Sequence, residues 1–375
     1  MNNRHGRNTV ASTYSAGRGR CLGFTLIELM VAMAVFLIIG GATFGLFNQH
    51  AKLFNDQQYQ VGLNISMRNA LSQLESDMVN AGTGYYLTVT RATWPIGVII
   101  KNSAPGGGCY NAATFTYQAS CFDTLRILTT DSTTPPGAPG FDATGAGCTN
   151  TNTSANAYVT PPSVINPATN ANWTVADYAK QFKNGDQVLF AGTSGNYNTA
   201  KLTADGTASG GTVQLVHMQT STAGQANTGP PNGTDPLDFS THNDANLAIS
   251  FCQATDWVVK LASPIVYTVD ATDPTNPQLT RAQGGATAVV AEQIIGFKVG
   301  ASTFVGATGS STALYNYDSS SYGYDYNSIR SVRASLIGRT PPNLANQYRN
   351  SFDQGPYKIE AMSVVVNPRN LSMND

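Results

Sequence analysis

One apolar run near the N-terminus constrains the fold of this chain more than any other feature. Residues 29–47 carry no charged side chain, and residues 24–27 lengthen the run toward the N-terminus. As a helix, residues 24–47 would be about 36 Å long at roughly 1.5 Å per residue, which is enough to cross a bilayer. We therefore expect a membrane-spanning helix, and the acid Glu28 in its first turns needs an explanation.

Basic residues before the run predict its orientation. Residues 1–23 contain Arg4, Arg7, Arg18 and Arg20 and no acid. Because positive charge beside a membrane helix stays in the cytoplasm, we expect a cytoplasmic N-terminus and an exported remainder. Over the whole chain, 21 Lys and Arg face 22 Asp and Glu. This balance gives no basic field for nucleic acid, so no direct nucleic-acid binding is expected.

The run differs from an ordinary secretory signal, in which a short apolar core precedes a small-residue cleavage site. Here no such site follows closely, and the sequence continues into a polar helical pattern. A lipoprotein signal ending at Cys21 is disfavoured because Arg18 and Arg20 stand where apolar residues would be needed.

Residues 23–28, Gly-Phe-Thr-Leu-Ile-Glu, follow a basic leader and open an apolar helix. This arrangement resembles the class III signal of type IV pilins and pseudopilins. The resemblance implies that a prepilin peptidase cleaves between Gly23 and Phe24, that Phe24 becomes the methylated N-terminus, and that the helix is kept as filament core.

The resemblance also implies that Glu28 meets the terminal amine of a neighbouring subunit during assembly. An ionised side chain in hydrocarbon is costly unless it is paired, so intramembrane acids are functional candidates. The alternative is that Glu28 only reaches the cytoplasmic interface by snorkelling.

Glycines late in the run predict close helix packing. Gly41 and Gly45 form a small-x-x-x-small pattern that lets helices approach one another. The alternative is the ordinary glycine content of a membrane helix.

Beyond Phe47 the pattern becomes polar but stays helical, because apolar residues recur at spacings of three and four. These residues are Met67, Leu71, Leu74, Met78 and Ala81. We expect a leader at 1–23, a filament-core half-helix at 24–47, an amphipathic half-helix at 48–81 and a globular domain at 82–375. A continuous helix over 24–81 would be roughly 87 Å long.

The globular part reads as β-rich, because short β-branched runs alternate with turn-rich stretches. The fold class expected is therefore α+β, with a long helix packed on an antiparallel, pilin-like domain. Strands are expected at 97–100, 124–128, 187–190, 212–217, 257–269, 278–281, 288–299, 331–339 and 359–366. Long loops are expected at 102–123, 130–172, 220–246 and 301–328.

The late runs IVYTVD, QLTRA, VVAEQIIGFKVG and IRSVRASLIGRT resemble the C-terminal sheet of PilW-type minor pilins. This resemblance implies a structural subunit that initiates or caps a type IV pilus used in twitching, adhesion or DNA uptake. Implied partners are the prepilin peptidase, other minor and major pilins, and the inner-membrane assembly platform. The implied location is the inner membrane before assembly, and a periplasmic and extracellular fimbrium afterwards. A J-like pseudopilin of type II secretion and a pilus-tip adhesin are the alternatives.

Four cysteines stay in the exported part when Cys21 leaves with the leader: Cys109, Cys121, Cys148 and Cys252. An even number outside the cytoplasm predicts disulfides. Three connectivities exist, and the short intervening loop favours Cys109–Cys121, which leaves Cys148 with Cys252. No pair has the C-x-x-C spacing of zinc sites, so no metal is expected.

The chain has none of the common catalytic signatures, neither G-x-S-x-G, H-E-x-x-H nor a Walker A loop. We expect no enzyme activity, no catalytic residue and no cofactor. The acids in 270–277 and 233–246 read as Asx turns in preference to calcium ligands. The tyrosine-rich stretch 315–326 is either a contact surface or a locally packed loop.

Overall fold

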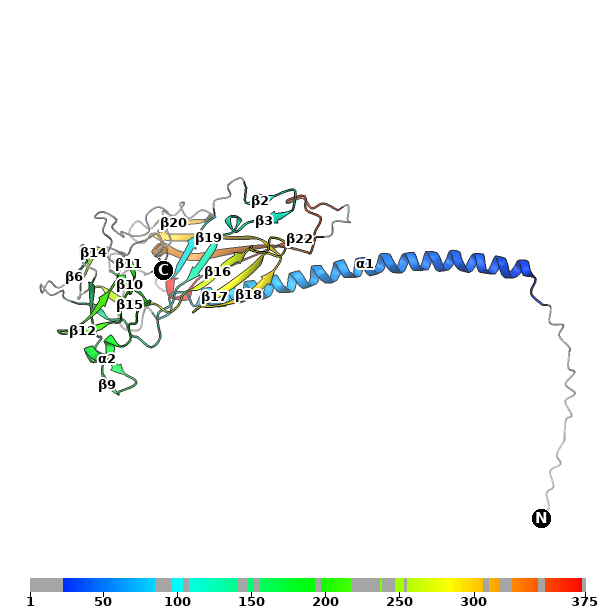
Figure 1. Cartoon of the computed structure of the whole chain (residues 1–375). Coiled ribbons are helices and arrows are strands. Elements are labelled where there is room, and N and C mark those ends of the chain that lie inside the picture. Colours follow the sequence, from blue (N-terminus) through cyan, green and yellow to red (C-terminus); the bar gives the residue numbers. More distant parts are fainter. Residues whose placement is uncertain are drawn as a thin grey trace, which may run out of the picture. The chain divides into compact units, whose positions relative to one another are not determined.

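The computed structural model describes residues 23–84, 96–103, 108–140, 148–151, 156–192, 197–217, 237, 247–252, 255–305, 310–316, 326–342 and 348–372 (Figure 1). The chain divides into two compact units, Met1–Gln58 and Tyr59–Asp375. Helix α1, Leu26–Val79, begins in the first unit and ends in the second.

In the second unit, α1 buries the apolar stripe that its sequence spacing predicts. Its buried residues are Leu63, Met67, Ala70, Leu71, Leu74 and Met78. The helix ends where Gly82 and Gly84 adopt positive φ angles of 72° and 91°, a backbone conformation that glycine adopts without strain. The Gly82 N–H donates to the Leu128 carbonyl at 2.7 Å, which ties the helix end to the β-rich part.

Two antiparallel sheets form the main core with this helix. One has the order β1-β4-β16-β17-β18 and the other β20-β19-β21-β22. Their bounds are Val98–Lys101 (β1), Thr124–Ile127 (β4), Ile265–Asp270 (β16), Gln278–Gln283 (β17), Ala286–Glu292 (β18), Ile294–Val305 (β19), Ser310–Asn316 (β20), Ile329–Arg339 (β21) and Ile359–Val366 (β22). One cluster of buried apolar residues from the helix and both sheets fills the space between them. The expected α+β fold is confirmed.

Strands β4 and β16 are neighbours in the first sheet, yet residues 128–264 lie between them in the sequence. This inserted lobe contains a four-stranded sheet β12-β13-β7-β5, a three-stranded sheet β11-β10-β15 and the pairs β14-β6 and β8-β9. Its elements are Ala138–Pro139 (β5), Cys148–Thr151 (β6), Asn156–Thr160 (β7), Ile165–Asn166 (β8), Ala171–Asn172 (β9), Val175–Ala179 (α2), Gln187–Ala191 (β10), Tyr197–Lys201 (β11), Thr207–Ser209 (β12), Thr212–Val216 (β13), Leu247–Cys252 (β14) and Trp257–Lys260 (β15).

The three-stranded sheet separates two hydrophobic cores. In β10 and β15, Leu189 and Val259 pack in the main core, whereas Phe190 and Val258 pack in a second core inside the lobe. Successive strand residues point to opposite faces, so a continuous apolar run such as residues 188–191 fits a strand buried on both sides.

Two expected strands are in fact four. The run 257–269 divides into β15 and β16, which belong to different sheets. Pro264 stands between them, and proline cannot donate a hydrogen bond to a sheet ladder. The run 288–299 divides at Gln293, whose φ of 57° interrupts the extended backbone between β18 and β19.

Several expected loops contain strands. The stretch 130–172 holds β5 to β9, and 301–328 holds the end of β19, all of β20 and a 3-10 turn, Tyr326–Ser328 (η4). The stretch 102–123 contains β2 (Tyr110–Asn111), β3 (Thr116–Tyr117) and another 3-10 turn, Ala119–Cys121 (η1). Apart from Leu237, the loop 220–246 lies outside the described residues. The short helices α2 and α3 (Arg369–Ser372) were not expected.

Candidate functional site at the start of the N-terminal helix

Thr25 and Glu28 form a reciprocal cap at the start of α1. The Glu28 N–H donates to Thr25 Oγ1 at 3.3 Å. In return, the Thr25 N–H and its hydroxyl both donate to Glu28 Oε2, each at 3.0 Å. This is a capping box, in which a threonine before the helix and a glutamate three residues later satisfy two backbone donors that have no partner inside the helix.

The capping box changes the account of Glu28. One carboxylate oxygen, Oε2, is hydrogen-bonded within the chain, while Oε1 accepts no hydrogen bond from any residue that the structure describes. The T-x-x-E pattern of this box is present in the sequence. Glu28 was interpreted only through its contacts outside its own chain, so Thr25 was not predicted as a functional residue.

Gly23 and Phe24, the residues of the expected cleavage site, precede the helix, and Phe24 is 86% exposed. The leader, with its arginines and Cys21, lies outside the described residues. The cleavage and methylation roles of these two positions stay predictions.

The first half of α1 is apolar on every side. Exposed large side chains include Leu29, Met30, Phe36, Ile38 and Phe44. The Thr43 hydroxyl, a rare polar group there, donates to the Ile39 carbonyl at 2.8 Å. A helix that is apolar all round belongs in a membrane or inside a larger assembly, and α1 is long and apolar enough to cross a membrane.

Gly41 and Gly45 lie in this apolar half. Apart from its chain neighbours and the backbone of its own helix, a Cβ atom built on either residue would meet nothing within 4 Å. Their proposed role in close helix packing stays a prediction.

A charged contact fastens the second half of α1 to the first sheet. Asp77 Oδ2 accepts hydrogen bonds from Arg281 Nε and from the Tyr267 hydroxyl, both at 2.6 Å, and Oδ1 accepts from the second guanidinium nitrogen at 3.2 Å. Hydrogen bonding to Asp77 raises the pKa of Arg281 above its usual value. Bidentate pairs of this kind give orientation as well as energy, so α1 is held against β16 and β17.

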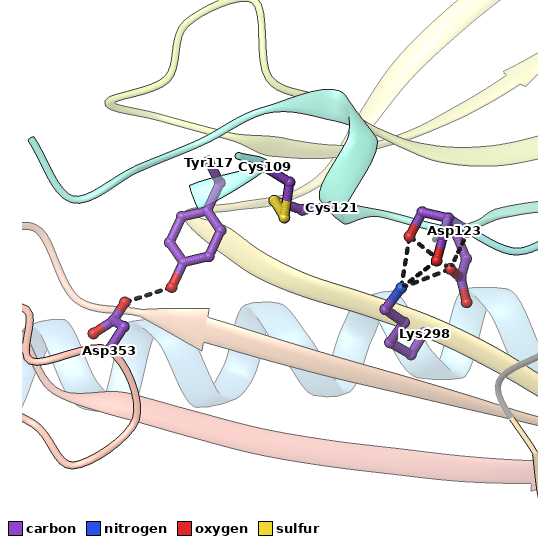
Figure 2. The surroundings of a disulfide bond; sticks show 7 residues. Cys109, Tyr117, Cys121, Asp123, Lys298 and Asp353 are labelled. Atoms are coloured by element: carbon purple, nitrogen blue, oxygen red, sulfur yellow. Dashed lines mark hydrogen bonds and ion pairs between the residues drawn. A yellow bond between two sulfur atoms is a disulfide. The ribbon is translucent and has the colours of Figure 1, made fainter. Parts of the chain in front are cut away.

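Residues near the Cys109–Cys121 disulfide pin the loop 108–123 to other parts of the domain (Figure 2). The bridge joins Cα atoms 5.2 Å apart, and it is the pairing that the short loop favours. Tyr117 donates to Asp353 Oδ2 at 2.5 Å, and Lys298 lies 2.9 Å from Asp123.

The second expected pairing stays a prediction. Cys252 is disulfide-bonded. Its Cα partner across the β14–β6 pair is Cys148. This register agrees with the expected Cys148–Cys252 connectivity.

We expect Asp353 to make the domain less stable in acid. Burial alone would raise the pKa of Asp353, but hydrogen bonds from Tyr117, Tyr357, Gly355 and Asn350 outweigh it and hold the pKa below its usual value. A lowered folded-state pKa contributes stability above the unfolded value of about 3.9, and the contribution is lost as pH falls through the folded pKa. Urea midpoints should therefore decrease below about pH 4. Asp353→Asn should flatten this part of the profile, and an unchanged profile would contradict the role.

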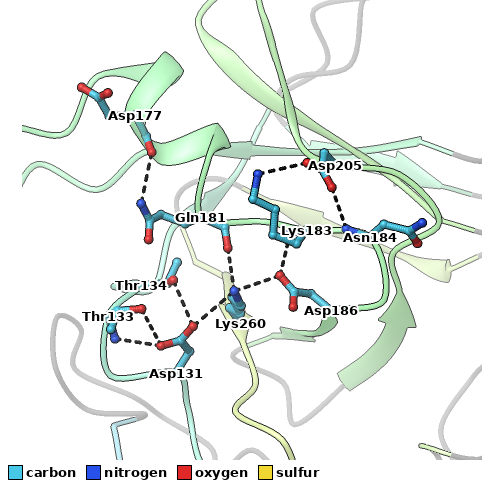
Figure 3. Close-up of polar contacts among 10 residues, drawn as sticks. All are labelled: Asp131, Thr133, Thr134, Asp177, Gln181, Lys183, Asn184, Asp186, Asp205 and Lys260. Carbon is cyan, nitrogen blue, oxygen red and sulfur yellow. Dashed lines mark hydrogen bonds and ion pairs between the residues drawn. The ribbon is translucent and has the colours of Figure 1, made fainter.

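Lys260, near the end of the inserted lobe, contacts Asp131 near its start and Gln181 and Asp186 within it (Figure 3). Its Nζ lies 3.2 Å from Asp131 Oδ2, 2.8 Å from Asp186 Oδ2 and 2.6 Å from the Gln181 carbonyl. Burial alone would raise the pKa of Asp131, but hydrogen bonds from Thr133 and Lys260 hold it below its usual value. An ionised acid beside a lysine is a structural ion pair, not an acid and base poised near neutral pH.

The remaining sequence candidates occupy structural positions. Asp270 and Asp273 accept hydrogen bonds from the N–H groups of Thr272 and Thr275, both at 2.9 Å, as Asx turns require. Tyr326 is buried and donates to the Ile100 carbonyl at 3.0 Å, so this tyrosine is not part of a contact surface. Residues 317–325 lie outside the described part. Among the described residues, no group of three or more His, Cys, Asp or Glu side chains could hold a metal ion.

Comparison with known proteins gives one match. Residues 18–44 match the family model of the prokaryotic N-terminal methylation motif. No curated protein and no solved structure matches the chain. The matched segment covers the basic residues Arg18 and Arg20, the Gly23–Phe24 junction, the capping box and the apolar helix up to Phe44. The chain thus carries an N-terminal methylation motif, which supports its membership of the type IV pilin family.

Proposed function

We propose that the protein is a PilW-like minor pilin that helps to initiate or cap a type IV pilus. The observation that carries this proposal is the methylation motif at residues 18–44, which leads into a helix that is apolar on every side. Such a helix is stable in the inner membrane before assembly and among other helices in a filament afterwards. The domain after residue 82 then lies outside the cytoplasm, first in the periplasm and later on the pilus.

The working parts in this proposal are few. A prepilin peptidase cleaves between Gly23 and Phe24, and Phe24 is methylated. Oε2 of Glu28 stays in the capping box, while Oε1 meets the amine of a neighbouring pilin. Pairing offsets the cost of a carboxylate in an apolar surrounding. Recruitment of the subunit by the assembly platform and by other pilins follows from the same segment.

The N-terminus of the mature protein tests the proposal. Mass spectrometry of the protein recovered from its own cells should show a chain that begins at Phe24 and carries one added methyl group. Gly23→Leu should keep the leader, whereas Gly40→Leu, a matched glycine change inside the helix, should be processed normally. A recovered chain that begins at Met1, or after Phe47, would contradict the proposal.

A J-like pseudopilin of type II secretion is the second candidate, because the same motif opens both kinds of subunit. Deleting the gene separates the two: loss of surface pili and twitching supports the pilus, and loss of exoprotein secretion supports the pseudopilus. The inserted lobe, residues 128–264, is the feature that favours a third role as a tip adhesin. Purified protein that binds no cells or surfaces would contradict that role.

A further inference from the structure

Strand β18 is an outer strand that the domain leaves open. It is the last strand of the sheet β1-β4-β16-β17-β18, after β17 (Figure 1). Unlike an ordinary edge strand, it exposes four successive residues, Ala286 to Val289, on both faces, and Val289 is 52% exposed. Beyond its pairing with β17, no other described residue hydrogen-bonds to its backbone.

Several other edges of the described sheets are covered or short. The Ile100 carbonyl of β1 accepts a hydrogen bond from Tyr326, and β15 pairs at Val258 with Gly137. Strands β5 and β12 have two and three residues. Strand β22 is long, but its residues alternate between exposed and partly buried, as in a sheet with one face on the core. In β18, by contrast, side chains on both faces are exposed and the backbone edge away from β17 is unpaired among the described residues.

Residues 286–291 of β18 carry neither the charges nor the proline that usually protect an edge from pairing. Natural edge strands carry lysine, proline or inward-pointing charges for that purpose. Residues 286–291 are Ala-Thr-Ala-Val-Val-Ala, with no charge and no proline, although a bulge interrupts the β17–β18 pairing near Val290. Small side chains also leave the backbone accessible to another strand.

The arm formed by β17 and β18 is anchored and preorganised. Its turn is Gly284-Gly285, with φ angles of 59° and 83°. Positive φ at both central residues is the pattern of tight two-residue hairpins whose twist matches the strands. Within the arm, Arg281 of β17 lies opposite Ala288 and is fixed by Asp77, so the open edge is held in place before any partner arrives.

We propose that β18 binds an extended strand of a neighbouring filament subunit by β-strand addition. An edge of unpaired N–H and C=O groups specifies an extended backbone as its partner. The uncharged stretch 286–291 specifies an uncharged strand, because burying an unpaired charge is unfavourable. Glu292 ends β18 exposed and without an ion pair among the described residues, so the partner strand carries Lys or Arg at that end. This inference rests on the proposed function.

Site-specific photocrosslinking tests it in the full-length protein, in its own cells. The probe is benzoylphenylalanine at Val289, with the same probe at Val365 of β22 as the matched control, because the two valines are 52% and 49% exposed. We expect a crosslink from position 289 to a pilin-like subunit in sheared filaments, and none from position 365. A processed protein that is present in filaments but does not crosslink from 289, or crosslinks equally from 365, would overturn the inference alone.

A charge on the edge gives a second readout. Val289→Lys should lower the amount of the protein in sheared filaments severalfold, whereas Val365→Lys should leave it unchanged. Because both side chains are exposed, neither change should alter folding, and equal far-ultraviolet circular dichroism of the two variants checks this. Equal incorporation of both would overturn the inference. Absence of even the unsubstituted protein from filaments would instead refute the proposed function.

Discussion

A Glu28→Ala variant should be cleaved and inserted into the membrane normally, yet assembled filaments should decrease by about tenfold or more, the factor that corresponds to 1.4 kcal/mol. The substitution removes the carboxylate that is expected to meet a neighbour's amine, and it also removes half of the capping box with Thr25. Filaments sheared from cells and quantified by immunoblot measure the effect. Mature-chain mass spectrometry confirms that processing is unchanged.

Two further substitutions separate the charge of Glu28 from its capping role. Glu28→Gln keeps a side chain that can complete a capping box but carries no charge. Thr25→Val removes the hydroxyl of the cap and keeps the carboxylate, at a cost of about 1 kcal/mol in helix stability. If pairing with an amine drives assembly, the glutamine variant should fail and the valine variant should assemble. The opposite pattern would show that the cap is the essential part.

Asp123→Ala should lower the free energy of unfolding by about 3 kcal/mol, the lower end of the loss when one partner of a buried ion pair is removed, because the Lys298 side chain is 29% exposed. Asp123 is 0% exposed. Its carboxylate accepts from Lys298 Nζ at 2.9 Å, from the Val299 N–H at 2.8 Å and from the Ser103 N–H at 2.9 Å. Asn102 Nδ2 and the Ser103 hydroxyl also donate to it, at 3.0 and 3.1 Å. The alanine variant would leave the buried Val299 N–H and the partly buried donors of Asn102, Ser103 and Lys298 without this acceptor.

Urea unfolding of the detergent-solubilised protein, followed by tryptophan fluorescence, measures this loss. The control is the double variant Asp123→Leu with Lys298→Met, which replaces both charges by apolar side chains. We expect it to be markedly more stable than the single variant, because exchanging a buried ion pair for apolar groups is often neutral. A single variant within about 0.5 kcal/mol of the parent would contradict the role. Asp123 directly precedes β4, and its carboxylate binds both the loop after β1 and strand β19. It therefore helps to hold the two main sheets together.

The N-terminal part of the molecule could be predicted from local sequence alone. The apolar run, the spacing of Met67, Leu71, Leu74 and Met78, and the glycines after Ala81 each report on a helix within a few residues of themselves. The same holds for strands such as β21 and β22, because each contains β-branched residues within one continuous run. The Cys109–Cys121 bridge was favoured for a local reason as well, since it closes a short loop.

The inserted lobe could not be predicted in the same way. Its strands are two to six residues long. Their partners are distant, as when Val159 of β7 pairs with Val213 of β13. Short runs of Thr, Asn and Ala carry little strand signal without those partners. The buried contacts of Asp123 depend on residues 20 to 176 positions away, so no local pattern marks them.

The sheet β11-β10-β15 has a consequence for how the protein unfolds. Alternate residues of β10 and β15 belong to a different hydrophobic core on each side of the sheet. The lobe is therefore not expected to fold independently of the rest of the domain. Removing residues 128–264 would expose the side of the main core that Leu189 and Val259 cover. On heating, the main core and the lobe core should unfold in a single cooperative transition.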